Sequence, residues 1–178
     1  MLVSTKNKRE IKAESLRAAA RVMQRCDALA LASLNPDYIE RTYLSKAHAQ
    51  ANKIVEGWIS EAQMESWQDS VGNVWGRYTC KETNAPVLII GSHLDSVVNA
   101  GKYDGILGVL LGIELGNFLA RHQIDLPFHL DVVGFCDEEG VRFGATLLGS
   151  QALTGKWQPE WIELTDESGV SLAEAMIE

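Results

Sequence analysis

The feature that most constrains the fold of this chain is a continuous apolar run at residues 87–91 together with a second, largely apolar run at 128–135. Runs of this length and composition are typical of strands that are buried on both faces of a sheet. The segment between them, residues 105–122, is apolar and long enough to form a buried helix. Strands that alternate with helices predict an α/β fold with at least some parallel pairing.

The remaining elements follow from periodicity and turn residues. We predict a first helix at residues 4–33, which buries a stripe that includes Leu16, Ala20 and Met23, and a second at 42–62 with Thr42 as its N-cap. The segments 64–69, 74–79, 144–154 and 171–177 are expected to form, in order, two strands joined as a hairpin and two short helices. The predicted fold class is therefore α/β, with a mixed, partly parallel sheet flanked by helices.

Composition narrows the classes of partner. A chain of 178 residues fits one domain of ordinary size, and its net charge of −8 disfavours nucleic acids and anionic membranes as partners. The three cysteines, Cys26, Cys80 and Cys136, are far apart and form no CxxC pair, which indicates reduced thiols and a cytoplasmic protein. The apolar run at 105–120 is too short to span a bilayer.

Glycines recur every three or four residues in the central helix, at Gly105, Gly108, Gly112 and Gly116. In a membrane this spacing is typical of helix dimerisation. In a chain without a membrane span, it favours a helix that lies close against a sheet.

The first apolar run is followed by His93 and Asp95. Loops at the carboxyl ends of strands are where open α/β sheets place their sites. Side chains two apart in an extended chain share a face, so Asp95 is able to accept a hydrogen bond from the ring of His93. The pair predicts either a metal ligand with its orienting carboxylate or a structural histidine.

Further carboxylates follow at Asp104, just before the central helix, and at Asp137, Glu138 and Glu139, just after the second apolar run. Asp104 has two alternative roles, which are compatible: an N-cap for the helix, or a carboxylate that bridges two metal ions. Adjacent glutamates point to opposite sides, so that one is able to bind metal while the other acts as a base; the alternative is a solvated strand end.

Three runs carry a resemblance to a known family: Gly-Ser-His-Leu-Asp-Ser at 91–96, Lys-Tyr-Asp-Gly at 102–105 and Glu-Glu-Gly-Val-Arg-Phe at 138–143. They resemble the M20-type co-catalytic zinc metallopeptidase superfamily, which includes aminoacylases and bacterial carboxypeptidases. Within it they are most similar to the N-carbamoyl-L-amino-acid hydrolase and allantoate amidohydrolase branch, because of the last run. The segment 69–77 is similar to that branch as well.

The resemblance implies a role for each residue. His93 would bind one metal ion, Asp104 would bridge two, and Glu139 would bind the second. Glu138 would be the general base and acid, and Asp95 would orient His93. The implied cofactors are two divalent metal ions, usually zinc and sometimes manganese, and the implied partners are a small ureido substrate and, in full-length relatives, a second copy of the chain.

The resemblance also implies parts that residues 1–178 do not contain. Family members add a further histidine ligand, a lid and dimerisation domain, and a last histidine ligand, and His48, His122 and His129 do not match these positions. We therefore expect the chain to be the N-terminal part of a metal-binding catalytic domain, inactive by itself. The alternatives are a dinuclear zinc aminopeptidase or deacylase, and a non-catalytic α/β fragment.

Overall fold

The computed structural model describes residues 8–177 of the chain. In chain order the elements are α1 (Lys8–Ala30), α2 (Lys46–Glu61), β1 (Glu65–Gln68), β2 (Val74–Tyr78), β3 (Val87–His93), α3 (Ile106–Arg121), β4 (His129–Phe135), α4 (Leu148–Leu153), the 3-10 helix η1 (Pro159–Glu163) and α5 (Leu172–Ala175). The predicted elements are all present, with bounds shifted by a few residues. The predicted residues 4–7 of the first helix lie outside the described part.

The four strands form one mixed sheet in the order β1-β2-β4-β3. β1, β2 and β4 are antiparallel neighbours, whereas β3 and β4 are parallel and are joined through α3. The register places His93 opposite Phe135, so β3 and β4 end at the same edge of the sheet. The predicted mixed, partly parallel α/β sheet is confirmed.

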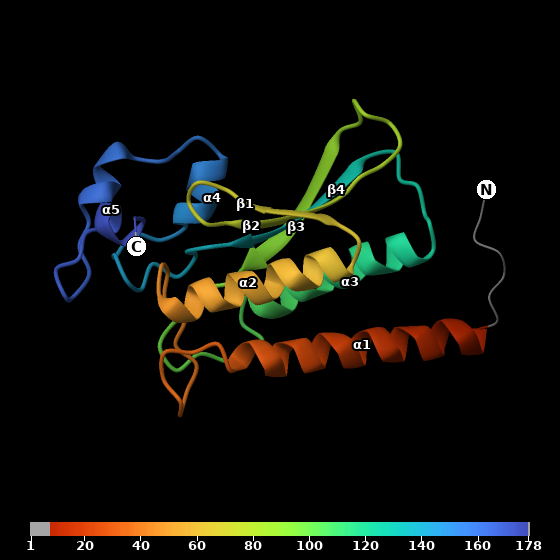
Figure 1. Ribbon diagram of the computed structural model, residues 1–178, viewed down its shortest axis with the longest axis horizontal. Helices are drawn as coiled ribbons and strands as arrows, with labels where there is room; N and C mark the ends of the chain where they lie inside the picture. Colours follow the sequence, from red (N-terminus) through yellow and green to blue (C-terminus); the bar gives the residue numbers. More distant parts are fainter. Residues whose placement is uncertain (1–7, 178) are drawn as a thin grey trace.

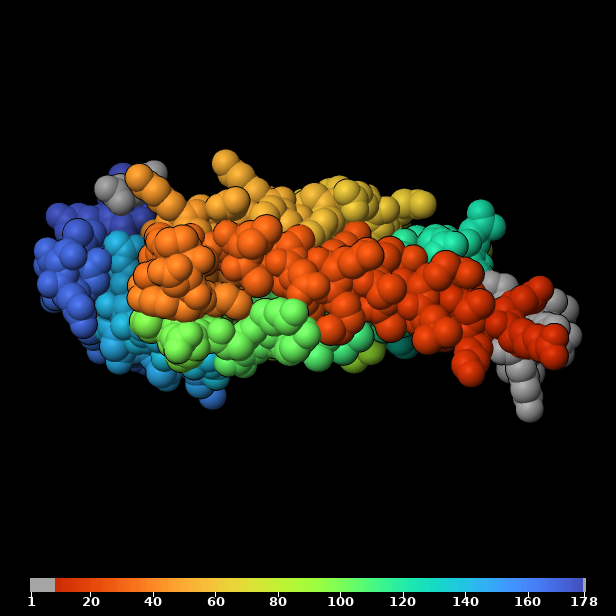
Figure 2. Space-filling view, turned by 90° about the horizontal axis from the view of Figure 1, so that it is seen from below, coloured from red at the N-terminus to blue at the C-terminus, as the bar shows by residue number. Residues whose placement is uncertain are grey.

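Helices α1, α2 and α3 all lie on one side of the sheet, and α1 is farthest from it (Figure 1). Seen from that side, α1 runs along the surface of the molecule, with α2 beside it (Figure 2). The main apolar core fills the space between the helices and the sheet. A second cluster of buried residues lies near the C-terminal helices and contains Tyr43, Cys136, Phe143, Leu148, Leu172 and Ala175.

The prediction that the stripe with Leu16, Ala20 and Met23 is the buried face of α1 is wrong. Leu16 is 62% exposed and Met23 is 42% exposed, whereas Val22, Cys26 and Leu29 are buried in the main core. Val22, Cys26 and Leu29 have the same helical spacing as the predicted stripe, and periodicity alone does not show which of two apolar stripes faces the core. The N-cap predicted for the second helix is also wrong, since Ser45 and not Thr42 caps α2 by accepting a hydrogen bond from the backbone N–H of His48.

The prediction that residues 87–91 form a strand buried on both faces is wrong as well. Among the described residues β3 pairs only with β4, so it is an edge strand. Val87, Leu88 and Ile89 are 42%, 47% and 45% exposed. An unbroken apolar run shows that a strand has high β-propensity, but it does not show how many neighbours cover that strand.

The glycine spacing of α3 has the predicted effect on packing. A Cβ atom at Gly108 would lie 2.7 Å from Ser92 Cβ on β3, and one at Gly112 would lie 2.7 Å from Val132 Cγ1 on β4. Real Cβ atoms do not approach other side chains so closely, so glycine at these positions lets α3 lie against the sheet. Within residues 8–177 no helix is long and apolar enough to cross a membrane.

Alanine at Gly112 should therefore destabilise the protein. The clash with Val132 costs about 1–3 kcal/mol for overpacking, which exceeds the roughly 1 kcal/mol gained in helix propensity. The matched control is Gly57→Ala in α2, where an added Cβ meets no atom within 4 Å and only the gain remains. Urea denaturation measures both, and equal stabilisation by the two substitutions would show that α3 does not pack as described.

His48 of α2 gives the fold a pH dependence. The imidazole is buried beside Tyr43, with the two ring centroids 5.8 Å apart, and burial lowers the pKa of His48 to about 4. Nearby Asp95 opposes this shift, and Arg41 adds to it. The folded protein therefore holds a neutral imidazole where the unfolded chain, with an ordinary pKa near 6.5, takes up a proton.

Stability contributed by His48 should be fully present above pH of about 6.5 and should be lost as pH falls toward 4. We expect the free energy of unfolding of the wild type to drop by about 1–2 kcal/mol more between pH 7 and pH 5 than that of His48→Phe. Urea denaturation at both pH values measures the difference. The same drop in both proteins would contradict the assignment.

Candidate metal centre

His93 is the last residue of β3, and its imidazole lies at the shared edge where β3 and β4 end. The side chain is mostly buried. Nδ1 lies 3.1 Å from the backbone oxygen of Asp95 and 3.4 Å from its carboxylate Oδ1. Nδ1 is thereby turned toward Asp95, and Nε2 is left to face the loop that carries Asp104.

Asp95 is buried and holds two loops together. Its Oδ1 accepts a hydrogen bond from the backbone N–H of Glu138 at 3.0 Å, and its Oδ2 accepts one from Glu139 at 3.1 Å. The intervening Leu94 is fully buried. The carboxylate predicted to orient His93 therefore also fixes the backbone of the two glutamates.

Asp104 lies in the loop between β3 and α3. The prediction that Asp104 is the N-cap of α3 is wrong. Gly105 occupies that position with a φ of 65°, and no side chain caps the helix. The Asp104 carboxylate instead points to His93, with Oδ1 3.8 Å from Nε2. A Cβ at Gly105 would lie 2.6 Å from the ring of His93, so glycine is needed for the helix to begin this close to the imidazole.

Glu138 and Glu139 follow β4, and their side chains are half-buried. The pKa of Glu139 is raised, chiefly by burial and then by the charge of Glu138. Asp137 is buried and not part of a solvated strand end, and burial together with the charge of Asp95 raises the pKa of Asp137 to about 8. Within the described residues its Oδ2 accepts no hydrogen bond.

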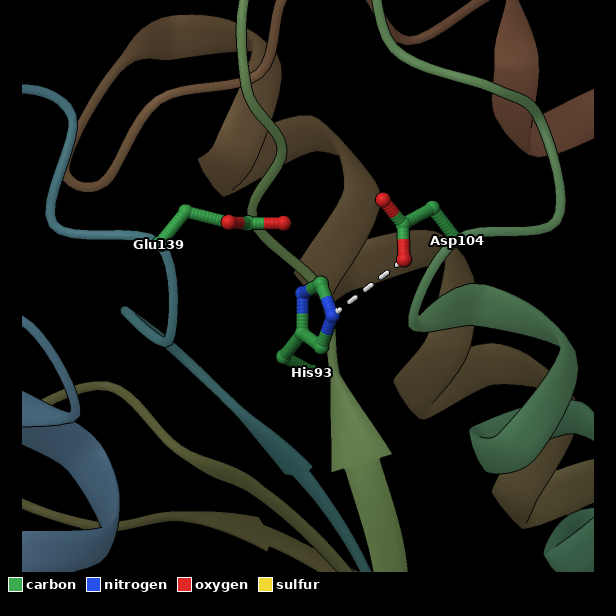
Figure 3. Close-up of side chains that lie close together, drawn as sticks. All are labelled: His93, Asp104 and Glu139. Atoms are coloured by element: carbon green, nitrogen blue, oxygen red, sulfur yellow. Dashed lines mark ion pairs between the residues drawn. The ribbon is translucent and has the colours of Figure 1, made fainter.

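The folded chain brings His93, Asp104 and Glu139 together from three separate segments (Figure 3). One ligand atom from each lies within 4.8 Å of the others. An imidazole nitrogen and two carboxylate oxygens at this spacing are a donor set that suits a divalent cation such as zinc or manganese. Glu138 is not a member of this group, and its role as the base stays a prediction.

The pKa of His93 is consistent with a site for a cation. Burial lowers the pKa of His93, but the hydrogen bond and the charge of Asp95 raise it more, to about 9. The carboxylates thus favour a positive charge at this position. A cation bound by the three side chains would supply that charge and would take the place of the proton on the ring.

Arg41 is a contributor that sequence reasoning missed. Its buried guanidinium donates hydrogen bonds to the backbone oxygens of Leu94, Leu29 and Ala32, and burial lowers its pKa to about 10. The Leu94 contact ties the segment after His93 to the end of α1. No local pattern at Arg41 signals this role, because its partners are carbonyl groups distant in the sequence.

Comparisons with known proteins identify the family of the chain. The sequence profile described as Peptidase family M28 matches residues 73–166, which is more than half of the chain. The chain belongs to this family. The profile is named M28 rather than M20, the label that the motifs suggested, whereas the relatives have the amidohydrolase names of the predicted branch.

Two relatives illustrate the likeness in sequence. The chain is 42% identical to Allantoate deiminase from Arabidopsis thaliana over 146 residues, which cover 79% of this chain and 27% of that protein. It is 39% identical to N-carbamoyl-L-amino acid amidohydrolase from Geobacillus stearothermophilus over 138 residues, which cover 78% of this chain and 34% of that protein.

Solved structures agree in fold. A hydantoinase/carbamoylase family amidase from Burkholderia ambifaria matches with a TM-score of 0.83 at 29% identity, over 89% of this chain and 39% of that one. AtUAH in complex with glyoxylate matches with a TM-score of 0.83 at 32% identity, over 89% of this chain and 38% of that one. The chain spans about a third of the length of the relatives it matches.

Replacing Asp95 with asparagine should lower the pKa of His93. The substitution removes the charge that raises the pKa of His93 to about 9 and leaves the burial that lowers it, so the midpoint should fall well below 9. An NMR titration of the His93 ring in metal-free protein measures this. Asp131→Asn is the control, since Asp131 is an equally buried aspartate that pairs with Arg77, and a midpoint near 9 in Asp95→Asn would refute the coupling.

Proposed function

We propose that this chain supplies three ligands of a two-metal centre in a hydrolase that cleaves ureido or carbamoyl C–N bonds. The observation that carries the proposal is the convergence of His93, Asp104 and Glu139 within 4.8 Å, where β3 and β4 end at one edge of the sheet. Hydrolysis of a linear amide or amidine of this type needs an activated water, a base and a group that polarises the carbonyl oxygen. Cations held by the three ligands would activate the water and polarise the carbonyl oxygen, and Glu138 would be the base.

Each residue has a part in the proposed reaction. His93, through Nε2, and Glu139 would each hold one cation, and Asp104 would bridge the two. Bound divalent cations acidify water and polarise a carbonyl oxygen. Glu138 would take the proton of the attacking water and deliver it to the departing nitrogen. Asp95 would keep His93 in the tautomer with its proton on Nδ1 and hold the backbone of both glutamates.

The substrate class rests on the relatives. Those with the printed names Allantoate deiminase, N-carbamoyl-L-amino acid amidohydrolase and Allantoate amidohydrolase align over most of this chain. We therefore propose allantoate or an N-carbamoyl amino acid as the substrate. The three cysteines are free and buried, which supports a reducing compartment such as the cytosol.

A second candidate is a peptidase or deacylase, which the matching profile of Peptidase family M28 favours. The same ligands and base would serve on a peptide bond, so only the substrate separates the two functions. Release of ammonia from allantoate or an N-carbamoyl amino acid supports the first, and release of an amino acid from a dipeptide supports the second.

The test separates metal binding from catalysis. Zinc titration with a chromophoric competitor should show binding that is lost in His93→Ala and is unchanged in Glu138→Gln, because Glu138 is outside the ligand group. For turnover, the matched segment is placed into the amidohydrolase from Geobacillus stearothermophilus in place of its own. The chimera should hydrolyse N-carbamoyl amino acids, and Glu138→Gln should reduce the rate by about 10²–10⁴-fold.

Two results would contradict the proposal. Zinc binding that survives His93→Ala would show that the ion is held elsewhere. A chimera that keeps its rate with Glu138→Gln would remove Glu138 from the role of base.

A further inference from the structure

Arg142 joins three segments that are distant in the sequence. Its Nη1 donates hydrogen bonds to the backbone oxygens of Tyr43 at 3.1 Å and Leu44 at 2.8 Å, in the segment that leads into α2. Its Nε donates to Oδ2 of Asp166 at 3.0 Å. The side chains of Arg142 and Asp166 are only 18% and 11% exposed, so water competes little for these contacts.

Arg142 belongs to the loop of residues 137–144, here called the acidic loop, which carries Glu138 and Glu139. At the beginning of this loop, the two glutamate N–H groups are held by Asp95. At its end, a turn is closed by the hydrogen bond from Gly144 N–H to the oxygen of Gly140, and both glycines have positive φ values, of 74° and 66°. Two glycines in this conformation leave the backbone free to turn, so the loop needs side-chain anchors.

The anchors at the end of the acidic loop are Arg142 and Phe143. Phe143 is buried in the second cluster beside Tyr43, with ring centroids 6.3 Å apart. Asp166 is itself fixed, because its Oδ1 accepts hydrogen bonds from the N–H groups of Ser168 and Val170. The Arg142 guanidinium therefore donates hydrogen bonds to a fixed carboxylate on one side and to two carbonyl groups on the other.

We propose that Arg142 is a positioning residue for the metal centre: by fixing the end of the acidic loop, it sets where Glu138 and Glu139 lie relative to His93. The inference rests on the proposed function, and it explains why arginine and phenylalanine follow the paired glutamates. Three of the five N–H donors of this guanidinium make hydrogen bonds within the protein and link the end of the acidic loop to two other segments. The inference also assigns a role to the segment 164–171, which contains Asp166 and fixes its carboxylate.

The test compares two arginine–aspartate pairs in the full chain. Arg142→Ala releases the acidic loop, whereas Arg77→Ala removes a similar pair, with Asp131, between β2 and β4. Amide hydrogen exchange followed by NMR reports the Glu138 and Glu139 N–H groups, with Val132 in β4 as the reference for global opening. Zinc affinity is measured on the same proteins.

In Arg142→Ala we expect exchange at Glu138 and Glu139 to speed up by about tenfold relative to Val132, and zinc to bind about tenfold more weakly. Arg77→Ala should change neither ratio. Should Arg142→Ala fail to fold, Arg142→Lys and Asp166→Asn, which each keep part of the network, should give smaller changes of the same sign.

Unchanged relative exchange at Glu138 and Glu139 in folded variants would overturn the inference, and so would an equal effect of Arg77→Ala. A wild-type chain that binds no zinc would instead refute the proposed metal centre. The exchange measurement needs no metal, so it decides on Arg142 in that case as well.

Discussion

The site depends on one buried carboxylate. Asp95 accepts the backbone N–H groups of Glu138 and Glu139 and faces Nδ1 of His93, so a single side chain joins the loops after β3 and β4. An ionised group with almost no exposure is costly unless it is paired. The two N–H donors, the imidazole and the nearby charge of buried Arg41 meet that requirement, and any change in Asp95 would disturb all four groups together.

The sheet and α3 determine where the loops around this carboxylate lie, and those loops carry the candidate ligands and the candidate base. Parallel pairing brings the ends of β3 and β4 to one edge of the sheet, and close packing of α3 brings the loop with Asp104 to the same place. The carboxylates gathered there would repel one another without a cation. Burial lessens the repulsion by raising the pKa of Asp137, while a protonated His93 offsets part of the remaining negative charge.

Sequence reasoning predicted the β-α-β arrangement from a local pattern of apolar runs with polar ends. The choice of His93, Asp104 and Glu139 as ligands came from the resemblance to a known family, because the local pattern left other roles open for these residues. Sequence reasoning did not predict the hydrogen bonds between side chains and distant backbone groups. The bonds from Asp95 span 43 and 44 residues, and those of Arg41 end on carbonyl groups that carry no sequence signal. It also expected residues 87–91 to be buried on both faces of the sheet, whereas Val87, Leu88 and Ile89 are exposed on an edge strand. The assignment of Asp104 as an N-cap failed because Gly105 takes that position at the helix start.

The most direct test of the metal centre is a crystal structure of the zinc-soaked chain, with anomalous diffraction recorded on both sides of the zinc absorption edge. The account predicts an anomalous peak among His93, Asp104 and Glu139, at about 2.0–2.1 Å from Nε2 of His93. A peak bound to other residues, or no peak with the three side chains apart, would contradict it.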